Sequence, residues 1–154
     1  MELIIKRFDE LTNVELYEVL KLRSQVFVVE QNCIYQDIDD RDQDAVHLFY
    51  RDEDGIQSYL RVMDKSEHNN KITIGRVVSR KRRSGLATAL LKEGIKLAEE
   101  RFGADSIYVE AQVYARSLYE KIGFKQISEE FLEDGIPHVR MIYECGNKGQ
   151  RTDD

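Results

Sequence analysis

The sequence predicts one α/β or α+β domain that is built around a mixed sheet. Two observations support this class. Segments rich in β-branched and aromatic residues alternate with segments of helical periodicity along the 154 residues. In addition, residues 71–111 read as strand, helix and strand, and such a unit joins parallel strands through a right-handed crossover. We assign residues 1–145 to this domain and expect the polar, glycine-containing residues 146–154 to be a disordered tail.

The N-terminal half is expected to hold one helix and a three-stranded meander. Residues 3–7 form the first strand, and Thr12 and Glu15 have the spacing of a capping box. Apolar residues then recur at helical spacing from Leu16 to Phe27. Residues 30–44 are acidic and irregular, which predicts a long loop or short helical turns. The meander strands are expected at residues 46–51, 56–64 and 71–79, with turns at 52–55 and 65–70.

The C-terminal half begins with the clearest helix of the chain. Residues 85–102 carry an apolar stripe that includes Leu86, Leu90 and Leu97, and Gly103 stands where a helix ends. The remaining elements are expected to be a strand at 106–111, a short helix at 114–122, and strands at 124–129 and 138–144. A loop that holds Pro137, the only proline, is expected to join the last two strands.

Composition excludes several classes of protein. Hydrophobic residues make up 42% of the chain, which is too many for a disordered protein. The net charge of −6 argues against nucleic acid as a general partner. No apolar run approaches the roughly 18 residues of a membrane span, and no signal peptide is evident, so we expect a cytoplasmic protein. Cys33 and Cys145 lie far apart and favour neither a zinc nor a thioredoxin-like site.

Metal binding is not expected. Residues 37–44 resemble a calcium loop only superficially, because Arg41 occupies its fifth position and no glycine stands at its sixth. The three histidines, His47, His68 and His138, lack the spacing of metal ligands.

The most informative segment is the basic turn at residues 80–85. Four consecutive cations, Arg80 to Arg83, follow a strand and run into Ser84 and Gly85 at the start of a helix. The N-terminus of a helix binds anions, and arginine supplies bidentate donors for phosphate. We therefore expect a phosphorylated ligand between residues 77 and 91, although a solvated connection with Ser84 as an N-cap would give the same pattern. Neither a P-loop nor a Rossmann motif is present.

Four blocks in order extend this interpretation. Arg82–Ala87 fits the pattern Q/R-x-x-G-x-G/A, and Ala115–Phe124 reads A-x-x-L-Y-x-x-x-G-F. Both blocks resemble motifs of the GNAT superfamily of acyl-CoA N-acyltransferases. Val26–Cys33, which leads into Tyr35–Asp39, and Glu133–His138 resemble the ElaA-type branch. The resemblance implies a largely antiparallel mixed sheet with flanking helices, in which the parallel strands at 71–79 and 106–111 splay apart.

The resemblance also implies acetyl-CoA as the acyl donor. It implies that backbone N–H groups from Arg83 to Thr88 hold the pyrophosphate and that Val77 and Val78 pair with pantetheine as an added strand would. Arg83 stands where many members have glycine, and Gln112 stands where many have asparagine. The residues implied in donor binding are Val77, Val78, Arg82, Arg83, Ser84, Gly85, Leu86, Ala87, Thr88 and Gln112.

The implied reaction is direct transfer of an acetyl group to a primary amine of a small molecule or peptide. Tyr119 matches the acid that protonates the leaving thiolate, and the N–H of Val77 is the candidate oxyanion donor. Glu110 is the candidate base, acting through water, with Glu30 and His138 as rivals. The alternative is a non-catalytic acyl-CoA sensor, which needs no Tyr119.

The acceptor amine is expected to meet an acidic entrance. Its carboxylates would be Glu30, Asp37, Asp39, Asp40, Glu133 and Asp134. Glu30, Asp37 and His138 are the expected substrate-binding residues, although a solvated acidic loop would give the same pattern. A homodimer is the default expectation for the assembly.

Overall fold

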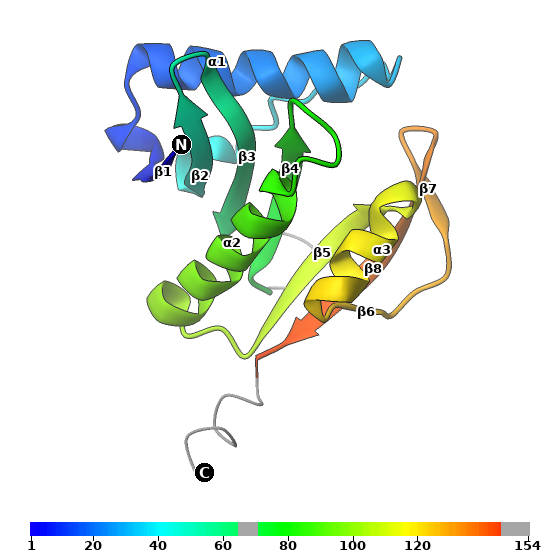
Figure 1. Cartoon of the computed structure of the whole chain (residues 1–154). Coiled ribbons are helices and arrows are strands. Elements are labelled where there is room, and N and C mark those ends of the chain that lie inside the picture. The colour runs from blue at the N-terminus through cyan, green and yellow to red at the C-terminus, as the bar shows by residue number, and fades with distance from the viewer. Residues whose placement is uncertain (65–70, 146–154) are drawn as a thin grey trace.

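One eight-stranded mixed sheet organises the chain in the computed structural model, which describes residues 1–64 and 71–145 (Figure 1). The expected turn at 65–70 and the expected tail lie outside the described residues. The strands are β1 (Glu2–Arg7), β2 (Val46–Asp52), β3 (Gly55–Met63), β4 (Thr73–Ser79), β5 (Ser106–Gln112), β6 (Lys125–Gln126), β7 (Phe131–Glu133) and β8 (Ile136–Glu144). The α-helices are α1 (Asn13–Arg23), α2 (Leu86–Phe102) and α3 (Arg116–Ile122).

The sheet has the order β1-β2-β3-β4-β5-β8-β6, and β7 pairs with β8. Every pairing is antiparallel except that of β4 with β5. The parallel pair shares a single register position, Thr73 with Tyr108, and the two strands then diverge (Figure 1). By contrast, β5 pairs with β8 along its whole length, from Ser106 to Gln112. The expected mixed, largely antiparallel sheet with a splayed parallel pair is therefore confirmed.

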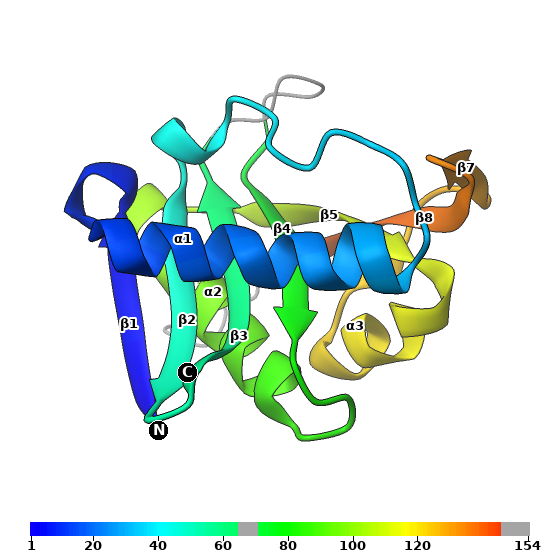
Figure 2. The same cartoon turned by 90° about the horizontal axis from the view of Figure 1, so that it is seen from above.

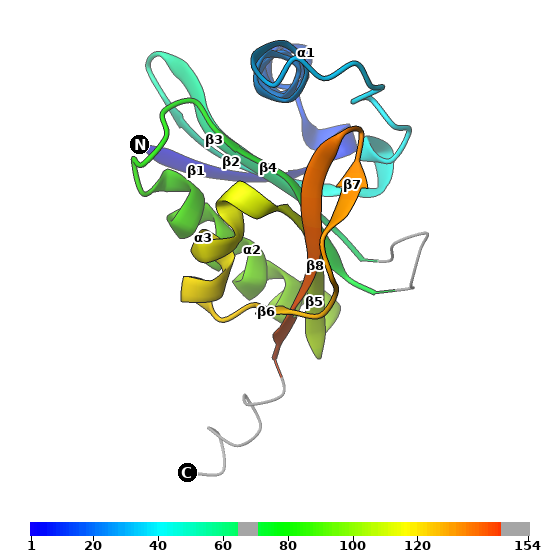
Figure 3. The same cartoon turned by 90° about the vertical axis from the view of Figure 1, so that its right-hand side faces the viewer.

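The helices cover opposite faces of the sheet. Figure 2 shows α1 crossing one face, and Figure 3 shows α2 and α3 together on the other. Val19 and Leu22 of α1 pack against Phe49, Tyr59 and Val78 to form the smaller core. The larger core lies under α2 and α3, where the apolar stripe of α2 meets the side chains that alternate to that face of the strands. Its central members are Leu48, Leu60, Ile74, Leu90, Leu91 and Val109.

The α1 helix begins and continues for identifiable reasons. Thr12 accepts a hydrogen bond from the Glu15 N–H, and Glu15 accepts one from the Thr12 N–H, so the expected capping box is present. Beyond Arg23 the chain widens into a π-helix over Ser24–Glu30. Its wider turns are visible in the bond from Cys33 N–H to Val28 O at 3.0 Å, five residues back.

Two predictions for the C-terminal strands are wrong. The strand expected at 124–129 is reduced to the two residues of β6, and residues 131–133 form β7 instead. A tight turn with positive φ at Asp134 (51°) and Gly135 (78°) joins β7 to β8, as Asp-Gly hairpin turns do. Pro137 consequently lies inside β8, opposite Leu132, rather than in a loop.

Candidate functional site

A cavity of about 410 Å³ opens where β4 and β5 diverge. Thr73, Gly75 and Glu110 line it from the α1 face of the sheet. Ile74 and Val109 line it from the opposite face, together with Tyr119 of α3. Because the lining comes from both faces, the cavity runs through the split in the sheet.

A β-bulge in β4 shapes one wall of this cavity. Gly75 pairs with Arg61 and Val78 pairs with Tyr59, so Arg76 and Val77 together face one residue of β3. Arg76 has a φ of 55°, which is unusual for a residue with a side chain. The bulge separates two residues that were expected to act together: Val77 lines the cavity, whereas the Val78 side chain is buried in the core under α1.

The basic turn adopts a conformation that leaves the start of α2 open. Arg83 (φ 61°) and Gly85 (φ 81°) are both left-handed. Ser84 Oγ donates to the carbonyl of Lys81 at 3.0 Å, which fixes the turn. Gly85 is the N-cap of the 17-residue helix α2 and has no side chain that could accept from the first-turn N–H groups. Only the Leu86 N–H has a side-chain acceptor, Ser84 Oγ at 3.5 Å, among the hydrogen bonds of the described first turn. With the exposed cations Arg80 to Arg83 beside it, this helix end suits a diphosphate.

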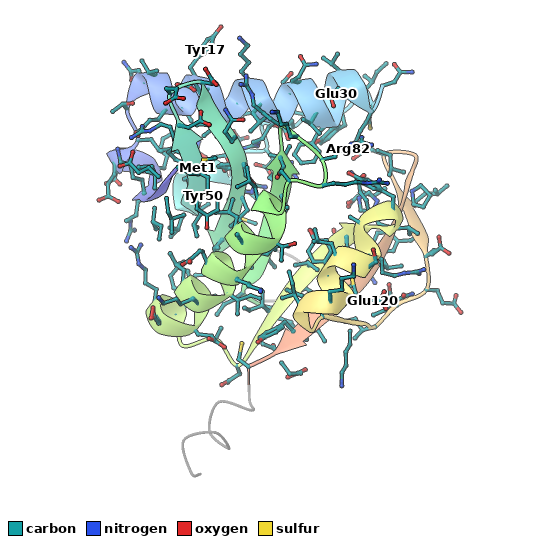
Figure 4. The ribbon with its side chains drawn as sticks, in the orientation of Figure 1. Met1, Tyr17, Glu30, Tyr50, Arg82 and Glu120 are labelled. Atoms are coloured by element: carbon teal, nitrogen blue, oxygen red, sulfur yellow. The ribbon has the colours of Figure 1, made fainter. Side chains whose placement is uncertain are left out.

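Arg82 connects the turn to the cavity. Its guanidinium lies 5.8 Å from the ring centre of Tyr114, and Tyr114 lines the cavity just after β5. Figure 4 shows Arg82 extending from the connection between β4 and α2 toward α3. Glu30 lies at the end of the π-helix and lines a second depression with Arg80 and Ser84, not the cavity itself. The expected role of Glu30 at the reacting amine thus has no support from its position.

Tyr119 projects from α3 into the cavity. Its side chain is 7% exposed and packs edge-to-face on Phe124, with 5.5 Å between the ring centres. Burial, and then the neighbouring Tyr114, raises the pKa of Tyr119 above its ordinary value. The hydroxyl therefore keeps its proton at neutral pH, as a proton donor must.

Glu110 lies on the opposite side of the split, on the α1 face of β5. Its carboxylate accepts a hydrogen bond from the Tyr108 hydroxyl at 2.9 Å and lies 3.8 Å from the Nε of Arg140. Burial, followed by the hydrogen bond to Glu110, raises the pKa of Tyr108 to about 12. Tyr108 therefore remains a donor that orients the Glu110 carboxylate.

His138 and Glu133 complete this side of the cavity. His138 Nδ1 lies 2.7 Å from the carbonyl of Ile136, and because a carbonyl only accepts, Nδ1 carries the proton of the neutral ring. In that tautomer Nε2 carries the lone pair, and Nε2 lies 3.7 Å from Glu133 Oε2. Burial, followed by the charge of Glu110, raises the pKa of Glu133. These three residues are the Glu110–Glu133–His138 group.

Gln112 occupies the cavity with a partner. Its side-chain amide and that of Gln31 exchange two hydrogen bonds, of 3.0 and 3.2 Å, between β5 and the end of the π-helix. Gln112 therefore has an intramolecular partner at the position where a cofactor contact was expected.

Asp37 belongs to a different set of charges, the arginine–aspartate cluster. This cluster consists of Arg23, Asp37, Asp39, Asp42, Arg61 and Arg76. Asp37 is 6% exposed, and its two oxygens accept from Arg23 Nε (2.9 Å) and Arg76 Nε (2.8 Å). Asp37 does not line the cavity. Its position therefore gives no support to the expected role in substrate binding.

The expected acidic entrance is therefore divided. Asp39, Glu133 and Asp134 line the cavity, whereas Asp40 is exposed outside it. Sequence reasoning missed the arginines of the cluster. One signal was available, because Arg23 interrupts an apolar helical stripe and an aspartate-rich segment follows it.

Two structural observations concern other classes of function. Over residues 1–64 and 71–145, no three His, Cys, Asp or Glu side chains gather as metal ligands would. None of the helices in these ranges combines the length and apolarity needed to cross a bilayer.

Comparisons with known proteins agree with this geometry. Residues 11–145 match the model of the acetyltransferase (GNAT) domain. A UPF0039 protein of Schizosaccharomyces pombe is 37% identical over 148 residues, which cover 94% of this chain and 97% of that protein. Protein ElaA of Escherichia coli is 34% identical over 140 residues, which cover 88% and 92% of the two chains.

Solved structures are similar over almost the whole chain. An acyl-CoA N-acyltransferase from Pseudomonas aeruginosa superposes with a TM-score of 0.85 at 36% identity, covering 93% of this chain and 99% of that one. The crystal structure of Escherichia coli ElaA gives the same TM-score and coverage at 33% identity. The chain therefore belongs to the GNAT family of acyl-CoA N-acyltransferases, in the branch that contains ElaA.

Proposed function

We propose that the protein transfers the acetyl group of acetyl-CoA directly to a primary amine through a tetrahedral intermediate. One observation supports this proposal: Tyr119 lines the cavity on one side of the split in the sheet, and the Glu110–Glu133–His138 group lines it on the other. A proton donor and a proton acceptor that face the same space are the two groups that such a transfer needs.

The residues present suit acetyl-CoA. The open first turn of α2 and the cations Arg80 to Arg83 would hold the pyrophosphate, with Arg83, Ser84, Gly85, Leu86, Ala87 and Thr88 supplying backbone N–H groups. Beyond Thr73, β4 has no register partner in β5, so the backbone edge at Val77 is available to the pantetheine arm. The carbonyl of Val78 already accepts from Ser58 Oγ at 3.0 Å, which limits what Val78 can offer. When bound, acetyl-CoA supplies an activated acyl carbon on a sulfur leaving group.

The acidic side of the cavity receives the amine. Glu110, Glu133 and Asp134 attract an ammonium group, and the amine must then lose a proton before it can attack. We assign that proton to Glu110, acting through water, with Nε2 of His138 as the second candidate. The variants Glu110→Gln and His138→Gln distinguish these two candidates. In the variant that lacks the true proton acceptor, the increase of kcat/KM with rising pH should be lost.

Two groups act on the other side of the reacting atoms. The N–H of Val77, in the bulge of β4, is the proposed donor to the developing oxyanion. The Tyr119 hydroxyl donates the proton that the departing thiolate needs.

The competing proposal of a non-catalytic acyl-CoA sensor has no observation in its favour. Tyr119→Phe distinguishes the two proposals, since the loss of a general acid lowers kcat by about 10²–10⁴-fold. Calorimetric binding of acetyl-CoA should stay unchanged. Tyr143→Phe is the matched control, because Tyr143 packs on the same Phe124 but does not line the cavity. An unaltered kcat in Tyr119→Phe would remove Tyr119 from the mechanism.

Thiol release from acetyl-CoA, measured with a panel of primary amines, tests the function itself. We expect turnover with at least one amine and no release with secondary alcohols. Binding of acetyl-CoA without turnover on any amine would favour the sensor, and absence of binding would reject both proposals.

A further inference from the structure

Two buried polar atoms in the cavity have no hydrogen-bond partner within the described part of the chain. They are Arg61 Nε and Thr73 Oγ1. Arg61 is 2% exposed and Thr73 is 7% exposed, and both line the cavity. Buried donors are nearly always paired because an unpaired one destabilises the fold. Two such atoms in one cavity therefore point to a ligand that accepts hydrogen bonds.

Arg61 and Thr73 are neighbours on one face of the sheet. Arg61 of β3 is paired with Gly75 of β4, and Met63 is paired with Thr73, so Arg61 and Thr73 are diagonal neighbours. Gly75 has no side chain to cover them, and a Cβ built on it would meet nothing within 4 Å. Gly75 therefore leaves the surface of the sheet between these two residues without a covering side chain.

The surrounding charges indicate what kind of oxygen fits. The Nη atoms of Arg61 are already bound to Asp39 and Asp42. Within the arginine–aspartate cluster three arginines face three aspartates, so the formal charges of the cluster cancel. Arg41, which also lines the cavity, lies outside the cluster and is not a free cation. A donor in neutral surroundings favours an uncharged acceptor, such as a carbonyl, over a carboxylate, which would lack a net opposite charge. Across the cavity, Glu110 and Glu133 favour an ammonium group.

We propose that Arg61 Nε and Thr73 Oγ1 form a carbonyl subsite for the acceptor. The acceptor class is then a primary amine with an amide carbonyl close to it, as in amino-acid amides and peptide N-termini, and not a simple alkylamine. This assignment rests on the proposed function, because it orients the amine toward the Glu110–Glu133–His138 group while the carbonyl binds Arg61 Nε and Thr73 Oγ1.

Thr73→Val tests the subsite with glycinamide and propylamine as probes. The KM for glycinamide should rise about five- to tenfold, as for the loss of one neutral hydrogen bond, while the KM values for propylamine and acetyl-CoA stay unchanged. The Tm should rise, because valine removes an unpaired buried hydroxyl. Ser58→Ala is the matched control: Ser58 Oγ donates to the carbonyl of Val78 at 3.0 Å, so its loss should lower the Tm. An equal rise in both amine KM values, or no rise, would overturn the subsite.

A binding measurement separates this inference from the proposed function. The Arg61 Nε–H resonance should shift when glycinamide is titrated into the protein and stay in place with propylamine. If this selective shift appears but no thiol is released, the proposed function fails and the subsite stands. If the resonance responds to neither probe, or to both alike, the subsite is wrong whatever the turnover shows.

Discussion

The arginine–aspartate cluster and the Glu110–Glu133–His138 group use similar side chains in opposite ways. In the cluster, Asp37 and Asp42 are buried and each accepts from two arginines. In the group, Glu133 is 47% exposed and its Oε2 lies 3.7 Å from His138 Nε2. Asp39, Arg61 and Arg76 of the cluster also line the cavity, but the carboxylates of the cluster are bound by arginines. Carboxylates that arginines bind therefore hold the fold, whereas the more loosely paired Glu133 and His138 are available for chemistry.

The pKa shifts express the same difference. Burial disfavours the charge on Asp42, but the hydrogen bonds and charges of Arg23 and Arg61 outweigh it and hold the pKa of Asp42 below its ordinary value. In the group, burial and the nearby Glu110 act in the same direction and raise the pKa of Glu133. Ionisation thus stabilises the folded state in the first region and destabilises it in the second.

Arg23→Met should break the cluster and give the largest effect on stability. Methionine fills much of the same space, but Asp37 and Asp42 would be left buried without their shared partner. We expect a loss of about 3–5 kcal/mol in the free energy of unfolding, measured in urea. Arg116→Met is the matched control, since Arg116 and Glu120 form an exposed pair at 4.0 Å and the loss should stay below about 1 kcal/mol. Equal losses would show that the cluster contributes no more than surface charge.

Asp39→Asn should give an intermediate loss that depends on pH. Burial raises the pKa of Asp39, yet its hydrogen bond to Arg61 outweighs this and holds the pKa below the ordinary 3.8. The stabilisation is therefore present above pH 4 and is lost as the pH falls through lower values. We expect a loss of about 1.5–3 kcal/mol at pH 7 that shrinks toward pH 2. A loss that is the same at both pH values would mean that the Asp39 charge is not involved.

Glu133→Gln should give the smallest effect, with the opposite sign. The raised pKa means that the folded state favours the protonated form of Glu133. Its contribution to the free energy of unfolding is present below the ordinary Glu pKa and is lost as the pH rises through the pKa of the folded state. Removal of the charge should therefore raise the Tm slightly at pH 7, with no gain at pH 4. Glu129→Gln, at an exposed glutamate, is the control. A lower Tm of the Glu133→Gln variant at pH 7 would show that the Glu133 charge stabilises the fold.

Much of the frame could be predicted from local patterns. The capping box at Thr12, the hairpin at residues 52–55 and the end of α2 at Gly103 depend on neighbours in sequence, and all three are present. Arg83 itself has a left-handed φ of 61°, a conformation that glycine adopts without strain. The Asp134–Gly135 turn carried an equally local signal, but the presence of Pro137 led to the wrong prediction of a loop.

The rest could not be predicted because it depends on partners far apart in the chain. Arg23 and Asp42 are 19 residues apart, and Arg76 and Asp37 are 39 apart. Whether a carboxylate in an acidic loop meets solvent, substrate or an arginine is decided only when those segments are packed together. For the same reason the sequence predicts Asp37 at the substrate and carries no signal for Thr73.

The divergence of β4 from β5 has a consequence for motion. The half of the sheet that ends at β4 and the half that begins at β5 share one register position, Thr73 with Tyr108. Beyond this position the backbones of β4 and β5 are not paired with each other. A linear molecule that binds between β4 and β5 would connect the two halves of the sheet. Hydrogen–deuterium exchange of the backbone N–H groups along Arg76–Ser79 should then slow when acetyl-CoA is bound.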